Sequence, residues 1–169
     1  MDRLVLADAS PLIALARLGG LGWLKSLFGS VALPETVRAE VLDCGAWPGQ
    51  ESLRAAIDAG VLVVRDDDGG APELPELDEG EAACIRLALL HGGPVLLLID
   101  ERAGRAVAAE HGLVVAGTAA VIGMAKQRDL IASARAEFEE LLRSDFRISG
   151  EVIRAVLSRV GELPLPHRS

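Results

Sequence analysis

Four acidic residues in this sequence occupy positions from which they could act together on a metal ion. Asp8 and Asp100 each follow directly on a run of aliphatic residues, at residues 4–7 and 95–99. Such runs are typical of strands buried in a parallel sheet, and open α/β sheets bind their ligands just beyond the carboxyl ends of these strands. Both aspartates are therefore expected at the functional edge of a sheet.

The other two acidic residues lie on apolar faces of predicted helices. Glu40 comes three residues after Val37 in a predicted helix over 35–44, and Glu81 lies on the apolar face of a predicted helix over 78–91. A carboxylate among core positions costs on the order of several kcal/mol unless it is paired or neutralised. If all four carboxylates converge, protonation or a bound cation must relieve their repulsion. An all-oxygen set suits Mg²⁺ or Mn²⁺ rather than zinc.

Each of these residues also has a structural explanation that involves no chemistry. Asp100 could cap the helix that follows it, and Asp8 could be a solvated strand end. Asp78 and Glu81 have the spacing of a capping box, in which the side chains at the N-cap and N3 positions bond to each other's backbone. Glu40 could turn to the edge of its helix and be solvated. The joint occurrence of the four favours the metal site over these separate explanations.

Further polar residues are expected near the same edge of the sheet. Arg102 and Arg105, three residues apart on a predicted helix, could clamp a phosphate, although surface solvation explains them equally well. Thr118 could hold a metal-bound water or act as a plain N-cap. Ser10 is expected as the N-cap of the first helix, with a hydroxyl that could support Asp8. The sequence offers no Ser–His–Asp or Cys–His arrangement for a nucleophilic side chain.

The elements that would position these residues alternate between strands and helices, which predicts a three-layer α/β/α domain with a parallel central sheet. The predicted strands cover residues 3–8, 31–33, 61–65, 95–99 and 113–116, and the predicted helices cover residues 11–18, 21–28, 35–44, 50–59, 78–91, 100–111, 117–128, 132–143 and 149–160.

Composition limits the class of protein. No apolar run approaches the roughly 18 residues of a membrane span, and acidic residues interrupt the N-terminus where a signal peptide would be apolar. Cys44 and Cys84 have no metal or redox spacing, so both are expected as buried free thiols of a cytoplasmic protein. The net charge of −8 argues against broad binding to nucleic acid. However, residues 101–169 carry 10 basic against 9 acidic residues, which leaves local phosphate contacts open.

The ordered set of these segments resembles the PIN-domain family, and within it the DUF3368 branch of predicted nucleic-acid-binding proteins related to VapC-like toxins. One departure is Glu101, where this branch commonly has a second Asp. The resemblance spans most of residues 3–130, and the matching segments are 8–15, 34–41, 77–82, 98–105 and 112–118.

The resemblance implies a divalent-metal-dependent ribonuclease that hydrolyses RNA phosphodiester bonds. It implies that Asp8, Glu40, Glu81 and Asp100 form the catalytic acidic cluster, with Asp8, Glu81 and Asp100 as metal ligands. It further implies the toxin of a toxin–antitoxin pair, with a small antitoxin protein as partner and a homodimer as the working unit. We expect residues 1–130 to form the nuclease domain and residues 131–169 to form a helical extension packed on it.

Other protein classes fit the acidic residues less well. A haloacid-dehalogenase-type phosphatase needs a second Asp two residues after Asp8, where this chain has Ser10. A response-regulator receiver would use Thr118 and Lys126 but needs paired acids after the first strand. A glycine-rich nucleotide-binding fingerprint is missing from the sequence. The remaining alternative is a PIN-like module that binds RNA or protein without turnover, to which the change Asp100→Asn would make no difference.

Overall fold

The computed structural model of the protein describes residues 3–66 and 69–162. Contacts between residues group the chain into two compact units, Met1–Gly117 and Thr118–Ser169. The expected division into a domain of residues 1–130 and an extension of residues 131–169 stays a prediction. Within the described residues, no helix combines the length and apolar character needed to cross a membrane.

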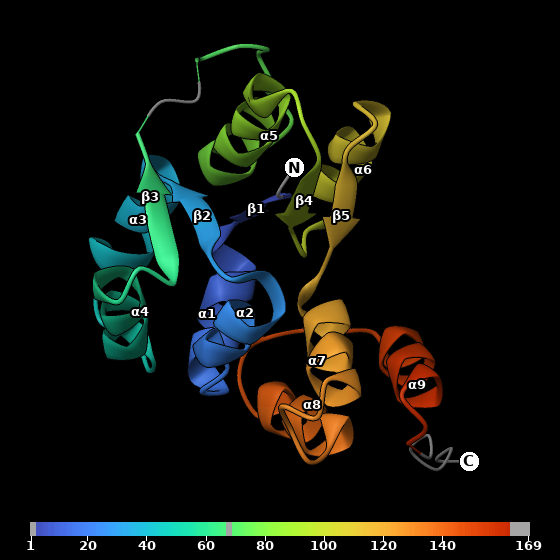
Figure 1. The fold of residues 1–169 in the computed structure, drawn as a ribbon. Coiled ribbons are helices and arrows are strands. Elements are labelled where there is room, and N and C mark those ends of the chain that lie inside the picture. The colour runs from blue at the N-terminus through green and yellow to red at the C-terminus, as the bar shows by residue number, and fades with distance from the viewer. Residues whose placement is uncertain (1–2, 67–68, 163–169) are drawn as a thin grey trace. The chain divides into compact units, whose positions relative to one another are not determined.

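The first unit is built on a parallel sheet of five strands in the order β3-β2-β1-β4-β5 (Figure 1). In the sheet, Ala7 lies opposite Leu98, and Leu98 lies opposite Ala116, so β1, β4 and β5 end level with one another. The strands are β1 (Leu4–Ala7), β2 (Val31–Pro34), β3 (Leu62–Arg65), β4 (Val95–Leu98) and β5 (Val114–Ala116).

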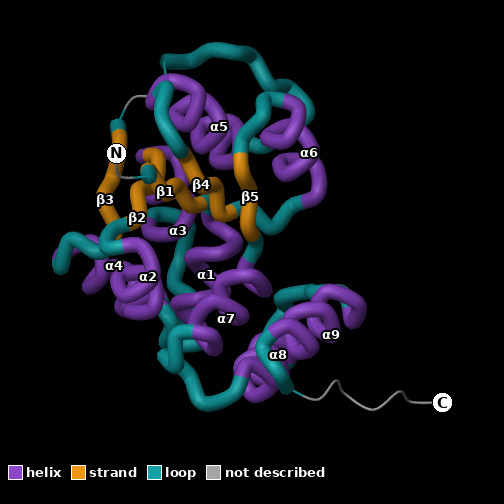
Figure 2. The backbone as a smooth tube through the Cα atoms, turned by 45° about the vertical axis from the view of Figure 1, so that its right-hand side comes forward, coloured by secondary structure: helices purple, strands orange, loops and turns teal. Residues whose placement is uncertain are grey.

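The helices of the first unit are α1 (Ala9–Arg17), α2 (Leu21–Phe28), α3 (Glu35–Leu42), α4 (Gln50–Asp58), α5 (Glu79–His91) and α6 (Arg102–Glu110). Helices α1 to α4 lie on one side of the sheet and α5 and α6 on the other (Figures 1 and 2). Right-handed crossovers place the helices in this way. The chain first runs along the sheet from β1 through β2 to β3, and it then crosses back past β1 to β4 and β5, so the later helices cover the other face. The predicted three-layer α/β/α fold with a parallel sheet is confirmed.

Strand β4 lies at the centre of the hydrophobic core. All four of its residues are buried, and Leu97, Leu98 and the following Ile99 are inaccessible to solvent. A strand with helices on both faces of its sheet has no polar face, which explains the uninterrupted aliphatic run in the sequence.

The second unit contains α7 (Thr118–Gln127), α8 (Ala134–Leu142) and α9 (Gly150–Arg159), with α7 packed against both of the others. The chain after α9 returns to the start of α8. The Glu162 carboxylate there accepts hydrogen bonds from the Ser133 hydroxyl (2.8 Å) and from the backbone N–H groups of Ala134 (2.6 Å) and Arg135 (3.3 Å). A negative charge in this position satisfies the unpaired N–H groups that every helix exposes at its N-terminus.

The prediction that Ser10 is an N-cap is wrong. Helix α1 begins at Ala9, with Asp8 in the cap position and in extended backbone geometry, so Ser10 lies half-buried inside the first turn. Pro11 is tolerated one residue later because the N–H groups of the first turn have no acceptor within the helix. The helix therefore starts as soon as β1 ends.

The prediction that both cysteines are buried is correct for Cys84 and wrong for Cys44, although both are free thiols. Helix α3 ends at Leu42, two residues earlier than the apolar pattern predicts, and Cys44 lies in the exposed chain beyond it.

We expect Leu97→Ala to destabilise the protein by about 2–5 kcal/mol, because Leu97 is fully buried in β4 and its loss leaves a cavity. Chemical denaturation followed by circular dichroism measures the change. Val63→Ala on the edge strand β3 is the matched control, since Val63 is 41% exposed. Equal losses in the two variants would contradict the burial of Leu97 in the core.

Candidate metal centre

Asp8 is held at the carboxyl end of β1 by the sheet itself. Its backbone N–H donates to the carbonyl oxygen of Leu98 on β4 at 3.0 Å. The side chain is only 3% exposed, and its Oδ1 is buried without a hydrogen-bond partner among the described residues. The alternative of a solvated strand end is therefore wrong. Burial, with smaller contributions from nearby acidic side chains, raises the pKa of the Asp8 carboxyl from 3.8 to about 7, against a backbone hydrogen bond from Ala9 that lowers it.

The first turn of α5 supplies two more carboxylates through a capping box. The Glu81 N–H donates to Asp78 Oδ1 at 2.8 Å, and the Asp78 N–H donates to Glu81 Oε2 at 3.3 Å, so the capping interpretation of this pair is confirmed. The box leaves Glu81 Oε1 unused. That atom is buried and has no partner among the described residues, and Glu81 is only 4% exposed. Capping therefore orients Glu81 without satisfying it.

Asp8, Asp78 and Glu81 come together in one cluster. Each contributes a carboxylate oxygen, and these oxygens all lie within 4.8 Å of one another. Asp78 is exposed, whereas the other two residues are buried. We expected Asp78 only as a cap, and its place in the cluster was not predicted. The signal was present, because the N-cap and N3 side chains of a capping box must lie side by side.

Glu40 reaches the same place from α3, across Gly80 of α5. A Cβ atom on Gly80 would lie 2.9 Å from Asp8 Oδ1 and 3.2 Å from Glu40 Oε2. Both carboxylates therefore border the same small space beside Gly80. The Glu40 side chain as a whole is exposed, but its carboxylate is partly covered, and this burial raises its pKa. The missing side chain at Gly80 leaves open the space between the acids.

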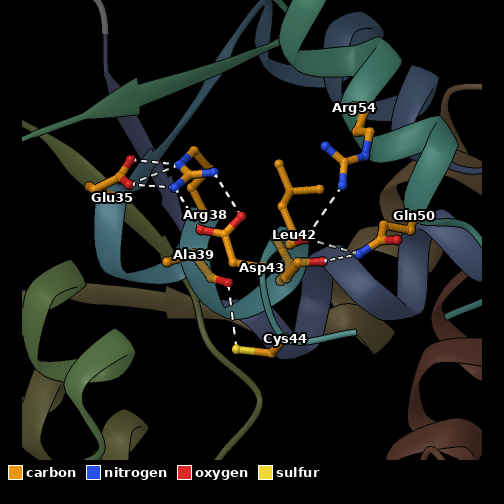
Figure 3. A network of polar contacts seen from close by, with 9 residues as sticks. Glu35, Arg38, Ala39, Leu42, Asp43, Cys44, Gln50 and Arg54 are labelled. Atoms are coloured by element: carbon orange, nitrogen blue, oxygen red, sulfur yellow. Dashed lines mark hydrogen bonds and ion pairs between the residues drawn. The ribbon is translucent and has the colours of Figure 1, made fainter. Parts of the chain in front are cut away.

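Polar contacts fix the end of the helix that carries Glu40 (Figure 3). The Arg38 guanidinium binds the Glu35 carboxylate, with Nε to Oε2 at 2.7 Å, and also Asp43 Oδ2 at 3.0 Å. The buried Gln50 side chain donates from Nε2 to the carbonyl oxygen of Val41 at 3.0 Å. The last carbonyl groups of α3 would otherwise be unpaired, and these contacts set where the helix ends.

Burial and acidic neighbours determine the electrostatics of the cluster. Burial is the main cause of the raised pKa values of Asp8, Glu40 and Glu81, and repulsion from acidic neighbours adds to it. The Cys84 thiol, fully buried, has a raised pKa for the same two reasons, desolvation first and the surrounding carboxylates second. A pair of charged carboxylates about 4 Å apart repel by on the order of 4 kcal/mol at an effective dielectric constant near 20.

The residues of the cluster fit a hard divalent cation. Two buried carboxylate oxygens, Asp8 Oδ1 and Glu81 Oε1, have no donor among the described residues, and Gly80 leaves room beside the first of them. The donor set consists of carboxylate oxygens alone, which is the set preferred by hard cations. Asp8, Asp78 and Glu81 could hold the ion, with Glu40 next to them.

The structure does not place the other candidate residues in this set of close oxygens. Asp100 is half-buried after β4, and Arg102 and Arg105 are exposed on α6. Asp100 Oδ1 and Arg105 Nη1 both lie next to Gly117. A Cβ on this glycine would be 2.9 Å from the first atom and 2.8 Å from the second. The roles of these three residues, of Ser10 and of Thr118 stay predictions. Thr118 is fully buried at the start of α7.

The fold and the cluster together define a class of protein. The parallel α/β/α unit gathers carboxylates at the carboxyl edge of its strands, where open α/β sheets bind their ligands, and this defines a candidate metal site. The family model DUF3368, described as a PIN domain, matches residues 4–162, so the chain belongs to this family and has its nuclease-like fold. No curated protein and no solved structure matches the chain.

We expect the metal-free protein to lose stability as the pH rises from about 4 to about 7. Asp8 has its ordinary pKa of 3.8 in the unfolded chain and a pKa of about 7 in the fold, so the folded state retains a proton that the unfolded state releases. Rising pH then favours unfolding, by on the order of 4 kcal/mol in all between these two pKa values. Asp8→Asn should raise the melting temperature in EDTA at pH 8 by several degrees and should have little effect at pH 4.

Differential scanning fluorimetry measures this comparison. Glu51→Gln is the matched control, because the Glu51 side chain is 91% exposed and its charge lies outside the cluster. An Asp8→Asn variant that melts no higher than the wild type at pH 8 would show that Asp8 is not strained by its burial.

We expect Gly80→Ala to weaken the binding of Mn²⁺ by at least tenfold, because the added methyl group would occupy the space between Asp8 and Glu40. Isothermal titration calorimetry without RNA measures the affinity. Gly22→Ala is the control, since a Cβ on this exposed glycine of α2 would meet nothing within 4 Å. Unchanged affinity in Gly80→Ala would mean that the ion, if bound, lies elsewhere.

Proposed function

We propose that the protein is a divalent-metal-dependent endoribonuclease that uses Mg²⁺ or Mn²⁺. The single observation that carries the proposal is the pair of buried, unpartnered carboxylate oxygens of Asp8 and Glu81 at the carboxyl edge of the sheet. Buried polar atoms without partners are rare in folded proteins, and a bound ion is one of the explanations for them. Membership in a PIN-domain family supports a nuclease over other uses of a cation.

In this proposal the chain's own residues divide the work. Asp8, Asp78 and Glu81 would hold the cation. A bound divalent cation lowers the pKa of a coordinated water and stabilises the charge that develops on a phosphate in hydrolysis. Glu40, which is accessible to solvent and has a raised pKa, is suited to accept a proton from the attacking water.

RNA is the proposed substrate, and basic side chains of the chain would contact its phosphates. Arg102 and Arg105 are exposed on α6, which begins just after β4 at the same edge of the sheet as the acids. The net charge of −8 favours a few local contacts over broad electrostatic binding. The alternative proposal is a PIN-like module that binds RNA or protein without cleaving it.

The biological role that we propose is that of the toxin in a toxin–antitoxin pair. A small antitoxin protein would inhibit the nuclease, and a homodimer would be the working unit. A cytoplasmic location suits the two free thiols of Cys44 and Cys84, because thiols stay reduced in that compartment.

We expect the purified protein to cleave structured RNA in the presence of Mn²⁺ or Mg²⁺ and to lose this activity in EDTA. Glu81→Gln should reduce cleavage by more than the roughly 10–100-fold typical of residues that only support a metal ligand. This variant keeps the fold intact, because glutamine at N3 also completes a capping box. Gel electrophoresis of labelled RNA measures the rate, and Glu51→Gln is the control.

Two outcomes of this assay would separate the proposals. Cleavage that persists in Glu81→Gln or in EDTA would contradict the metal-dependent mechanism. RNA binding without any cleavage by the wild type would favour the non-catalytic module.

A further inference from the structure

We infer that a cavity beside β3 binds one nucleotide of a single RNA strand, with Arg3 and Arg65 contacting the phosphates on either side of it. The inference rests on the proposed function, because it assigns a second contact to the same substrate. The cavity has a volume of about 510 Å³ and is formed by the start of β1, the end of α2, β2 and β3. Ligand sites in proteins typically have volumes of roughly 300–1,000 Å³.

The cavity exists because one face of the edge strand β3 is left open. Leu62 is 1% exposed and the next residue, Val63, is 41% exposed, as expected when successive side chains point to opposite faces of a sheet. Helices α3 and α4 pack on β3, whereas α5 packs on β1, β2 and β4. The open face of β3 carries Val63 and Arg65, and both residues line the cavity.

The charge of the cavity is opposite to that of the chain around it. Residues 1–100 carry 7 basic against 16 acidic residues. Two of these seven, Arg3 and Arg65, line the cavity, and no acidic residue is among the described residues that line it. Both arginines are exposed. A guanidinium presents a planar set of N–H donors that matches a phosphate group, so the cavity suits an anionic ligand with phosphates.

The positions of the two arginines favour a strand over a single small anion. Arg3 directly precedes β1, at the amino edge of the sheet, and Arg65 is the last residue of β3, at the carboxyl edge. The strands are parallel, so the two guanidinium groups reach the cavity from opposite ends. A free phosphate would meet one of them, whereas an RNA strand carries a phosphate on each side of every nucleoside.

The apolar part of the cavity suits a base. Phe28, the half-buried last residue of α2, lines the cavity together with Leu27 and Val63, and Ser30 adds a hydroxyl group. Bases of single strands stack on aromatic side chains, which contributes about 1–3 kcal/mol per base. An acidic peptide would use the arginines but would not need the aromatic ring.

The cavity begins close to the candidate metal centre. Leu6 pairs with Ala32, so Asp8, two residues further on, is level with Pro34, whose partner on β3 is Arg65. Neighbouring strands lie about 4.8 Å apart, which places the backbone of Arg65 about 10 Å from that of Asp8. An RNA strand held at the acids can therefore continue into the cavity from the carboxyl edge of the sheet.

Fluorescence anisotropy of a short labelled single-stranded RNA, measured with the full-length protein in EDTA, tests the inference. Without metal there is no contribution from a bound cation, so the cavity is measured by itself. The double variant Arg3→Gln/Arg65→Gln should weaken binding at least tenfold. It should also reduce the slope of log affinity against log salt concentration by about one unit or more, because two phosphate contacts are lost.

A second variant tests the stacking contact. Phe28→Leu keeps an apolar side chain at this half-buried position and should weaken binding about fivefold or more, without changing the salt slope. Circular dichroism checks that each variant is folded.

The matched control is Lys25→Gln. Lys25 is an exposed basic residue in the last turn of α2, close to Phe28 in the chain, and it is not among the residues that line the cavity. A loss of affinity in Lys25→Gln equal to that of either single arginine variant would reduce the effect to general electrostatics and overturn the inference. Competition by adenosine monophosphate or by polyglutamate as strong as that by unlabelled RNA would also overturn it.

Cleavage with Mn²⁺ separates this inference from the proposed function. If the wild type cleaves RNA while the double arginine variant binds RNA in EDTA as the wild type does, the nuclease stands and the cavity site is wrong. If the double variant loses RNA binding in EDTA while the wild type cleaves no RNA with Mn²⁺, the cavity site stands and the proposed nuclease is wrong.

Discussion

The burial of two carboxylates, those of Asp8 and Glu81, is the constraint on which the rest of the first unit depends. Asp8 and Glu81 are each less than 5% exposed, and each keeps one oxygen without a donor among the described residues. The apolar sheet and helices must be stable enough to hold these groups against a penalty of several kcal/mol, as an order of magnitude. The uninterrupted aliphatic packing around β4 supplies that stability, so the core and the site are two parts of one arrangement.

Ordinary helix chemistry positions the site. The capping box of α5 satisfies backbone groups that any helix start leaves unpaired, and in doing so it fixes Asp78 and Glu81 side by side. Gly80, between them in the chain, allows α3 to approach closely enough for Glu40 to reach Asp8. A structural and a functional explanation of the same residue are thus compatible, because a carboxylate has two oxygens and the cap uses only one of them.

Much of the fold follows from the sequence. A strand buried on both faces has an uninterrupted run of aliphatic residues, and strands that alternate with helices along the chain predict a parallel sheet. The sequence does not show where an element ends when the deciding contacts come from distant residues. Helix α3 stops before Cys44 where Gln50 binds its last carbonyl groups. In the same way, the sequence places the start of α6 too early: Glu101 takes its N-cap position, so the alternative that Asp100 caps this helix is wrong. Asp78 was missed because its role as a cap was a sufficient explanation.

The unequal burial of the two thiols makes the molecule easy to label. Cys44 is exposed just beyond α3, and Cys84 is enclosed beneath the acids with a raised pKa that further slows its reaction. A maleimide dye would therefore attach at a single position in the native protein without any engineered cysteine. That position follows the helix that carries Glu40, so the dye would lie beyond the end of α3 with all acidic residues of the cluster unchanged.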